Sequence, residues 1–170
     1  MRSGLKPEKL INASDPGDIP GSLAVDRIAA IKKAVGYLAR REHSCLELLQ
    51  KLVSSGYPED IVNAIVADLE QQGLVSDRRF AEAYVRYRKM KGFGPVRIRM
   101  EMEQKGIASS LSLELVGQNA QDWSVHAAKI RVKKFGIDPP VDYKERARQA
   151  RFLQHRGFSS DQIQYALSSD

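Results

Sequence analysis

Residues 44–57 read SCLELLQKLVSSGY, and this stretch decides the fold. Its leucines recur at three- and four-residue steps, as the buried face of a helix requires. Ser44 precedes Glu47 by three residues, which is the spacing of a capping box at a helix start. Gly56 tolerates the left-handed backbone at which many helices end. The stretch therefore predicts one short amphipathic helix closed by a glycine.

Helical patterns flank this stretch on both sides. Upstream, a helix is predicted from Asp26 to about Arg41, with apolar residues on one face. Downstream, Pro58 suits the first turn of a third helix, which Gly73 would end. The predicted inward residues of these two helices are Ile28, Ile31, Val35 and Leu38, followed by Ile61, Ile65 and Leu69. A three-helix unit follows from these patterns.

The glycine that closes the middle helix recurs along the chain together with a large apolar residue. Steps of 50 and 51 residues separate the three pairs, which are Gly56-Tyr57, Gly106-Ile107 and Gly157-Phe158. Such equal spacing indicates tandem repeats of one supersecondary unit.

Aligning the copies by these glycines brings their apolar positions into register. The aligned sets are Leu46 with Val96 and Ala147, Leu48 with Ile98, and Leu52 with Met102 and Leu153. The third copy departs at Gln149, which stands opposite Leu48. Its core must therefore be filled differently, and Ala150 is the candidate.

One segment of the second copy carries a conflicting pattern. Val96, Ile98, Met100 and Met102 alternate with charged residues, as in a half-buried strand. Pro95 suits a helix start, however, and Met, Glu and Arg are good helix formers. We therefore predict a helix here, and an all-α chain of about nine helices.

The predicted organisation is a flexible N-terminal extension followed by three tandem three-helix repeats. The extension covers 1–24, where prolines and glycines interrupt any period. The repeats cover 25–75, 76–121 and 122–170. Helical repeats stack on their neighbours, so we expect an elongated, curved array.

Composition restricts the class of protein. Cys45 is the only cysteine, so no intrachain disulfide framework is possible, which fits a reducing cytosol. No apolar stretch approaches the length of a membrane span or a signal peptide. We therefore expect a soluble, cytoplasmic protein. Coiled-coil heptads are absent, so we also expect a monomer.

The sequence offers no catalytic constellation. It has no phosphate-binding Gly-x-x-x-x-Gly-Lys-Ser/Thr loop. His43, His126 and His155 are far apart and lack the spacing of zinc ligands. Glu101 and Glu103 are helix neighbours two positions apart, so their carboxylates diverge. We predict that the protein is not an enzyme and holds no metal or cofactor.

Positive charge is concentrated in the second and third repeats. The whole chain has a formal net charge of +6. Nine basic and four acidic residues give net +5 over 76–106, and nine and four again give +5 over 122–158. Residues 24–75 hold six basic and seven acidic residues, net −1. This bias favours a polyanionic partner, although basic residues also solvate helix faces.

Several motifs of the chain resemble the RecX regulatory family. The second repeat carries Gly73-Leu-Val-Ser-Asp-Arg-Arg-Phe-Ala81, Tyr84-Val-Arg86, Gly92-Phe-Gly-Pro95 and Lys105-Gly-Ile107. The first repeat adds Ala39-Arg-Arg-Glu-His-Ser44, and the third adds Arg151-Phe-Leu-Gln154 and Arg156-Gly-Phe-Ser159. The resemblance spans roughly 26–168, so the extension 1–24 lies outside it.

The resemblance implies a regulator of homologous recombination, DNA repair and the SOS response. Members of the family bind the RecA recombinase and its filaments on DNA, and they inhibit its recombinase, ATPase and coprotease activities. The resemblance leaves open whether the protein caps filament ends or coats the groove. It also leaves open which repeats touch DNA, which touch RecA, and whether an accessory factor opposes the protein.

The basic residues of the second and third repeats are the candidate contact face for RecA and for single- and double-stranded DNA. Recognition of phosphate predicts weak binding without sequence preference. In the second repeat the candidates are Arg86, Arg88, Lys89, Lys91, Arg97, Arg99 and Lys105. In the third they are Lys129, Arg131, Lys133, Lys134, Arg148, Arg151 and Arg156.

Aromatic residues interleave with this basic run, as they do in proteins that stack single-stranded bases. Helical spacing favours a core role for Phe80 and Tyr84, and it leaves Tyr87 and Phe93 open between core and stacking. Trp123 opens the third repeat and is expected to anchor packing between copies.

The alternative function is a helix-turn-helix transcriptional regulator, since a three-helix unit can present a recognition helix to the major groove. Three unequal copies in one chain, however, do not supply the two-fold symmetry of operator-binding dimers.

Overall fold

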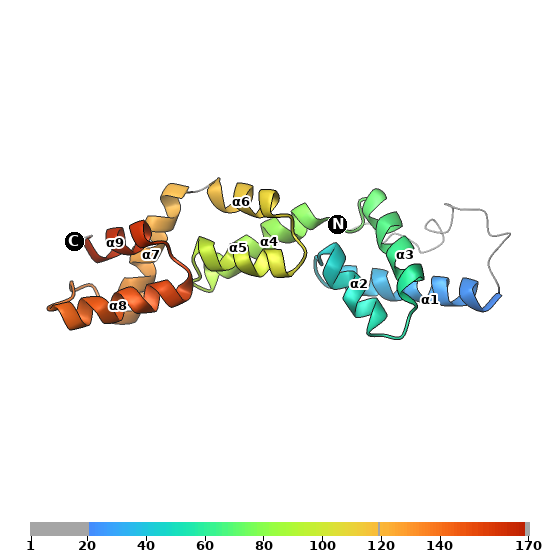
Figure 1. Cartoon of the computed structure of the whole chain (residues 1–170), viewed down its shortest axis with the longest axis horizontal. Helices are drawn as coiled ribbons and strands as arrows, with labels where there is room; N and C mark the ends of the chain where they lie inside the picture. The colour runs from blue at the N-terminus through green and yellow to red at the C-terminus, as the bar shows by residue number, and fades with distance from the viewer. Residues whose placement is uncertain (1–20, 119, 169–170) are drawn as a thin grey trace. The chain divides into compact units, whose positions relative to one another are not determined.

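The computed structural model describes residues 21–118 and 120–168, and every regular element in these ranges is an α-helix (Figure 1). The nine helices are α1 (Gly21–Leu38), α2 (Cys45–Val53), α3 (Glu59–Gln71), α4 (Asp77–Met90), α5 (Pro95–Gln104), α6 (Ser109–Gly117), α7 (Ala120–Phe135), α8 (Tyr143–Arg156) and α9 (Ser160–Ser168). The all-α class and the helix number are confirmed within the described ranges. None of these helices combines the length and apolarity needed to cross a bilayer.

The chain divides into two compact units, one ending at Asp77 and the other beginning at Arg78. The first unit holds α1, α2 and α3. The second holds the helices from α4 to α9, so the predicted second and third repeats share one unit. The predicted repeat boundaries, like the elongated, curved array, stay predictions.

The first unit is a three-helix group around the leucine face of α2. Leu48 and Leu52 are fully buried, and α3 adds Ile65 and Leu69 to the same cluster. The Ser44 hydroxyl accepts a hydrogen bond from the Glu47 amide at 3.0 Å, which caps α2 as its sequence predicts. The apolar spacing therefore identified this core correctly.

The first helix differs from its prediction in two respects. Its buried face is centred on Ala30 and Ala34, which are fully buried, whereas Ile28 is 42% exposed. Small side chains let α1 pack closely against α2 and α3, so the contact favours alanine over the larger neighbours. The helix also begins at Gly21, so residues 21–24 are not part of an extension. The remaining extension, 1–20, lies outside the described residues.

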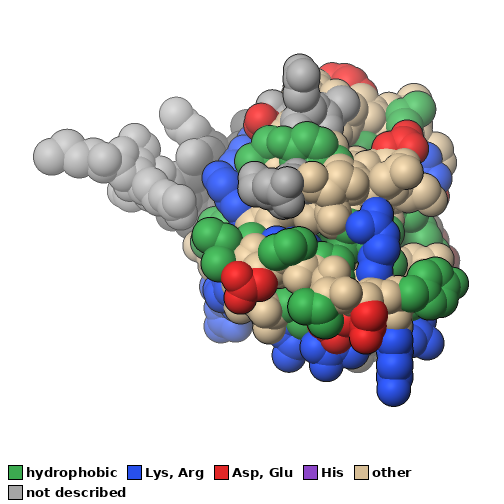
Figure 2. Space-filling view, turned by 90° about the vertical axis from the view of Figure 1, so that its left-hand side faces the viewer, with side chains coloured by type: hydrophobic (Ala, Val, Ile, Leu, Met, Phe, Trp, Pro, Cys, Tyr) green, Lys and Arg blue, Asp and Glu red, His purple; other side chains and the backbone are tan. Residues whose placement is uncertain are grey.

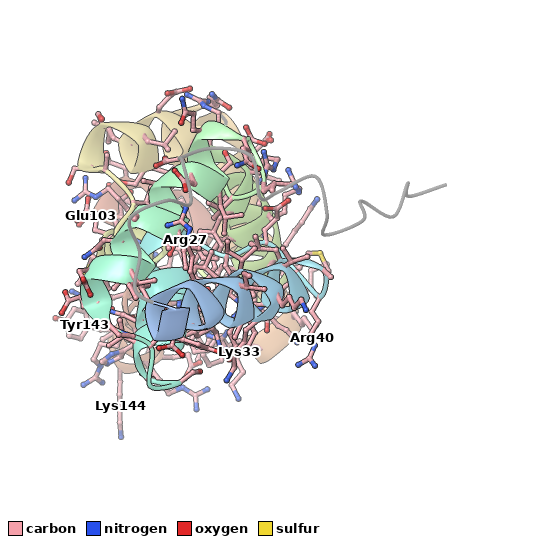
Figure 3. The ribbon with its side chains drawn as sticks, turned by 90° about the vertical axis from the view of Figure 1, so that its right-hand side faces the viewer. Arg27, Lys33, Arg40, Glu103, Tyr143 and Lys144 are labelled. Carbon is pink, nitrogen blue, oxygen red and sulfur yellow. The ribbon has the colours of Figure 1, made fainter. Side chains whose placement is uncertain are left out.

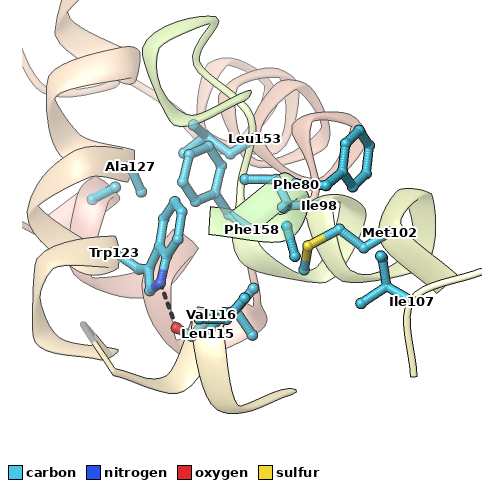
Figure 4. Packing of buried hydrophobic residues seen from close by; sticks show 12 residues of the cluster. Phe80, Ile98, Met102, Ile107, Leu115, Val116, Trp123, Ala127, Leu153 and Phe158 are labelled. Carbon is cyan, nitrogen blue, oxygen red and sulfur yellow. Dashed lines mark hydrogen bonds between the residues drawn. The ribbon is translucent and has the colours of Figure 1, made fainter. Parts of the chain in front are cut away.

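In the second unit, one core joins the second and third repeats (Figure 4). Phe80, Ile98 and Met102 of the second repeat pack in the same cluster as Leu153 and Phe158 of the third. Trp123 is buried in this cluster, and its indole Nε1 donates to the Val116 carbonyl at 2.8 Å. The expected anchoring role of Trp123 is confirmed.

Side-chain exposure explains the alternating segment of α5. Ile98 and Met102 are fully buried and lie four residues apart, on one helix face. Met100 is 53% exposed and Val96 is 43% exposed. The predicted helix is therefore confirmed, and the predicted core role of Val96 is wrong because position 96 points away from the cluster.

Two glycines hold the start of α5 against the end of α8. The Gly94 amide donates to the Arg156 carbonyl at 2.8 Å, and the Val96 amide donates to the Gly157 carbonyl at 3.0 Å. Amides at a helix start and carbonyls at a helix end lack partners within their own helices, so each end satisfies the other. A Cβ on Gly94 would lie 2.4 Å from the Gly157 carbonyl oxygen. This contact explains the second glycine of the Gly-Phe-Gly-Pro motif and the glycine of the Arg-Gly-Phe motif.

Candidate functional site

The predicted basic residues of α4 and α5 include two that are held by a carboxylate. Glu101 accepts hydrogen bonds from Arg88, from Arg97 Nε at 2.9 Å and from the Tyr84 hydroxyl at 3.0 Å. Burial raises the pKa of Glu101, but these hydrogen bonds outweigh it and bring the pKa below its ordinary value. Burial and the bond to Glu101 raise the pKa of Tyr84 to about 12. At neutral pH Glu101 is therefore ionised and Tyr84 keeps its proton, so the hydrogen bonds among them persist.

Three guanidinium groups enclose the ring of Phe93. The distances from the guanidinium carbon to the ring centroid are 3.7 Å for Arg88, 4.6 Å for Arg97 and 5.2 Å for Arg156. Such contacts are attractive because the ring face carries negative potential. Arg156 also donates to the Lys91 carbonyl at 3.1 Å. These arginines therefore stabilise the junction of α4, α5 and α8, and any role on a contact face comes in addition.

Arg131 is a correction to the predicted contact face, because it is 2% exposed. Its guanidinium donates to the carbonyls of Ile137 at 3.1 Å and Asp138 at 3.0 Å, which fastens the chain after α7. It also contacts Gln149 Oε1 at 3.4 Å. Gln149 itself is buried, whereas Ala150 is half-buried. The third repeat thus replaces the aligned leucine with a buried polar pair, and the expected filling by Ala150 is wrong.

Four further predicted cations have a partner near the surface. Their contacts are Lys89 with Asp122 at 3.9 Å, Arg99 with Glu103 at 3.7 Å, Arg148 with Glu145 at 2.8 Å, and Lys105 above the Tyr84 ring at 5.6 Å. Surface ion pairs contribute little to stability, so the pairs of Lys89, Arg99 and Arg148 leave these side chains available to a stronger anion.

The other six predicted cations are exposed, and no ion pair is found for them within the described residues. They are Arg86, Lys91, Lys129, Lys133, Lys134 and Arg151. Figure 2 shows the end of the molecule that carries α8 and α9, where Lys and Arg side chains project along the lower edge of a surface with apolar and acidic side chains.

A pocket of about 220 Å³ gathers several of these cations and is called the basic pocket below. Its charged lining is Lys91, Lys133, Lys134 and Arg156. Its other lining residues are Met90, Gly92, Ile130 and Phe152, so none of the described carboxylates lines it. The sequence predicted the four cations as contact residues, but it did not single out the four uncharged lining residues. The one available signal was an apolar Met90 set between two lysines.

The elements that form the basic pocket are the C-terminal ends of α4, α7 and α8. Residues 133 and 134 lie in the last turn of α7, and Arg156 is the last residue of α8. Each helix end carries about half a negative charge, which basic residues in the last turn offset. Three helix ends thus supply at most about −1.5 against four cations, since carbonyls at the end of α8 already accept from α5. The pocket retains a positive excess and suits a phosphate group.

Comparison with known proteins places the whole arrangement in one family. Models of the first, second and third three-helix domains of RecX match residues 30–69, 76–112 and 125–167. The Regulatory protein RecX of Halorhodospira halophila is 41% identical over 136 residues, which is 80% of this chain and 84% of that protein. The protein of the same name from Pseudomonas savastanoi is 39% identical over 141 residues, or 83% of this chain and 91% of that protein.

Solved structures agree on the fold. The crystal structure of RecX from Lactobacillus salivarius has a TM-score of 0.72 at 23% identity, with 84% of this chain and 95% of that chain covered. A second RecX crystal structure has a TM-score of 0.74 at 22% identity, with coverage of 92% and 83%. From the domain matches and the identity of its relatives, the chain belongs to the RecX family of regulatory proteins.

Proposed function

We propose that this protein binds RecA and RecA–DNA filaments and inhibits their recombinase, ATPase and coprotease activities. In this role it regulates homologous recombination, DNA repair and the SOS response. Membership of the RecX family supports the target. The single observation that carries the mechanism is the basic pocket, which four cations line and no carboxylate of the described residues lines.

The cations support contact with a filament of protein and nucleic acid. Phosphate contacts supply affinity without base readout, so DNA binding by the isolated protein is weak and independent of sequence. The six exposed cations without an ion pair and the basic pocket all belong to the second unit. We therefore place the nucleic-acid contact in residues 78–170, and we assign no DNA contact to the nearly neutral first repeat.

An ATP-hydrolysis assay tests this function. Equimolar or smaller amounts of the protein are added to RecA on single-stranded DNA, and phosphate release and strand exchange are followed. Both rates fall, while the protein alone hydrolyses no ATP. An unchanged RecA rate across a wide range of protein concentration contradicts the proposal. Tight, salt-insensitive binding to one selected duplex favours a transcriptional regulator instead.

A further inference from the structure

Of the aromatic residues interleaved with the basic run, Tyr87 has the most exposed ring. Tyr84 is half-buried, and its hydroxyl is bonded to Glu101. Phe93 is enclosed by guanidinium groups. Tyr87 is 53% exposed. Stacking a base requires an accessible ring face, so Tyr87 is the residue of this run that can offer one.

Tyr87 lies beside the basic pocket. The Lys91 Nζ is 5.7 Å from the centroid of the Tyr87 ring, since Tyr87 lies in the last turn of α4 and Lys91 follows that helix directly. Lys91 also lines the basic pocket. Met90, which lies between Tyr87 and Lys91 in the sequence, is 84% exposed and adds apolar surface. One lysine therefore lies between an exposed aromatic ring and a cluster of cations.

We propose that Tyr87 and the basic pocket form a subsite for single-stranded nucleic acid. A backbone phosphodiester lies in the pocket among Lys91, Lys133 and Lys134, and an adjacent base stacks on Tyr87. This inference rests on the proposed function and specifies which form of nucleic acid the site takes.

The size of the pocket supports this division of roles. Pockets that enclose a whole small molecule measure roughly 300–1,000 Å³. The basic pocket, at about 220 Å³, fits a phosphate with part of its sugar. Gly92 lets the end of α4 pack closely against α7 beside the pocket, because a Cβ there would lie 2.9 Å from Ile130 Cδ1. The base must then lie outside the pocket, where Tyr87 is exposed.

The same arrangement discriminates single strands from duplexes. In a duplex each base face is covered by its neighbours, so Tyr87 has nothing to stack on without unstacking a base step. In a single strand the base faces are accessible, and stacking is tolerant of sequence. The pocket cations bind the phosphates of single strands and duplexes alike, so the preference for single strands comes from Tyr87.

Fluorescence anisotropy with a labelled thymidine oligonucleotide, and with its duplex of equal length, measures this preference. The wild-type protein binds the single strand more tightly. Tyr87→Ala weakens single-strand binding about tenfold and leaves duplex binding within about twofold, because only the stacked base is lost. Tyr87→Phe keeps the ring and restores the preference. Equal or tighter duplex binding by the wild type, or an unchanged Tyr87→Ala variant, overturns the subsite.

The phosphate half of the subsite is tested by charge. The triple substitution of Lys91, Lys133 and Lys134 by Gln lowers the slope of log affinity against log salt by about 2, since each single-strand phosphate contact contributes roughly 0.7. The matched control replaces Lys32, Lys33 and Arg40 of the first unit by Gln, which removes the same charge there; Figure 3 shows Lys33 and Arg40. An equal loss in both triples overturns the inference.

Two further outcomes separate this inference from its alternatives. Millimolar inorganic phosphate or ATP that displaces the oligonucleotide completely from the wild type indicates a site for free anions and overturns the inference. RecA inhibition is measured in parallel. If single-strand preference is lost in Tyr87→Ala but the wild type leaves RecA unaffected, the subsite stands and the proposed function fails. If the wild type inhibits RecA but shows no single-strand preference, the proposed function stands and the subsite fails.

Discussion

The contact between α5 and α8 predicts a graded response to alanine at three glycines of the second unit. Gly94 has an ordinary backbone, and an added Cβ meets the Gly157 backbone at 2.4 Å. Gly157 has φ +87°, and its Cβ would lie 2.2 Å from Arg97 Cβ and 2.6 Å from its amide nitrogen. Gly136 has φ +95° with nothing within 4 Å, so it isolates the effect of the left-handed backbone.

The free energy of unfolding follows from these three environments. Gly136→Ala costs about 1–2 kcal/mol, which is the penalty of a left-handed backbone. Gly94→Ala costs roughly 1–3 kcal/mol, because backbone atoms must move to admit a methyl group. Gly157→Ala combines both effects and costs about 2–5 kcal/mol. The reduced entropy of the unfolded chain is common to all three variants and cancels in the comparison.

Urea denaturation followed by Trp123 fluorescence measures these values. Trp123 is the only tryptophan of the chain and is 2% exposed in the core of the second unit, so its emission reports unfolding of that unit. A Gly94→Ala variant within about 0.5 kcal/mol of wild type, the range of an ordinary surface substitution, would refute the close approach of α5 and α8. Equal losses for Gly136→Ala and Gly157→Ala would refute the clash with Arg97.

Two further predictions concern the cores and the Glu101 cluster. Leu48→Ala and Ile98→Ala, both at fully buried sites, each cost about 2–5 kcal/mol of unfolding free energy. Met100→Ala, at a 53% exposed site, stays within about 0.5 kcal/mol of wild type. Thermal melts that show no such difference contradict the alignment of the repeats. Glu101→Gln costs about 1.5–3 kcal/mol at neutral pH through weakened charged hydrogen bonds. Because the folded pKa of Glu101 is lowered, its stabilisation is complete above the unfolded value of about 4.3 and is lost as pH falls through the folded pKa. The Gln variant lacks this part of the pH dependence in urea titrations between about pH 3 and 7, and an identical profile for both proteins contradicts the assignment.

The sequence predicted the helices and the repeat because those depend on local spacing. Leu48, Ile98 and Met102 were placed correctly in the core from the three- and four-residue steps and the recurring glycine. The buried face of α1 was misplaced because helix spacing weighs Ile28 above Ala30, whereas close packing between helices selects the smaller side chain.

The candidate site was predictable only in part. Charge counts located the positive potential in the second and third repeats, and eight of the fourteen proposed cations are exposed there. The burial of Arg131 was not predictable, because its partners are carbonyl groups of the chain after α7. The roles of Arg88 and Arg97 were also missed, since a shared carboxylate and the Phe93 ring reach them only through the packing of α4, α5 and α8.

The most direct test of the central claim is the ATPase rate of RecA on single-stranded DNA during titration with three forms of this protein. The forms are the wild type, the Lys91/Lys133/Lys134→Gln triple and the Lys32/Lys33/Arg40→Gln control, each checked by circular dichroism for native helix content. We predict that the wild type and the control inhibit at similar concentrations, and that the pocket triple requires at least roughly tenfold more protein for the same inhibition. A pocket triple that inhibits as well as the wild type, or a wild type that does not inhibit, contradicts the account.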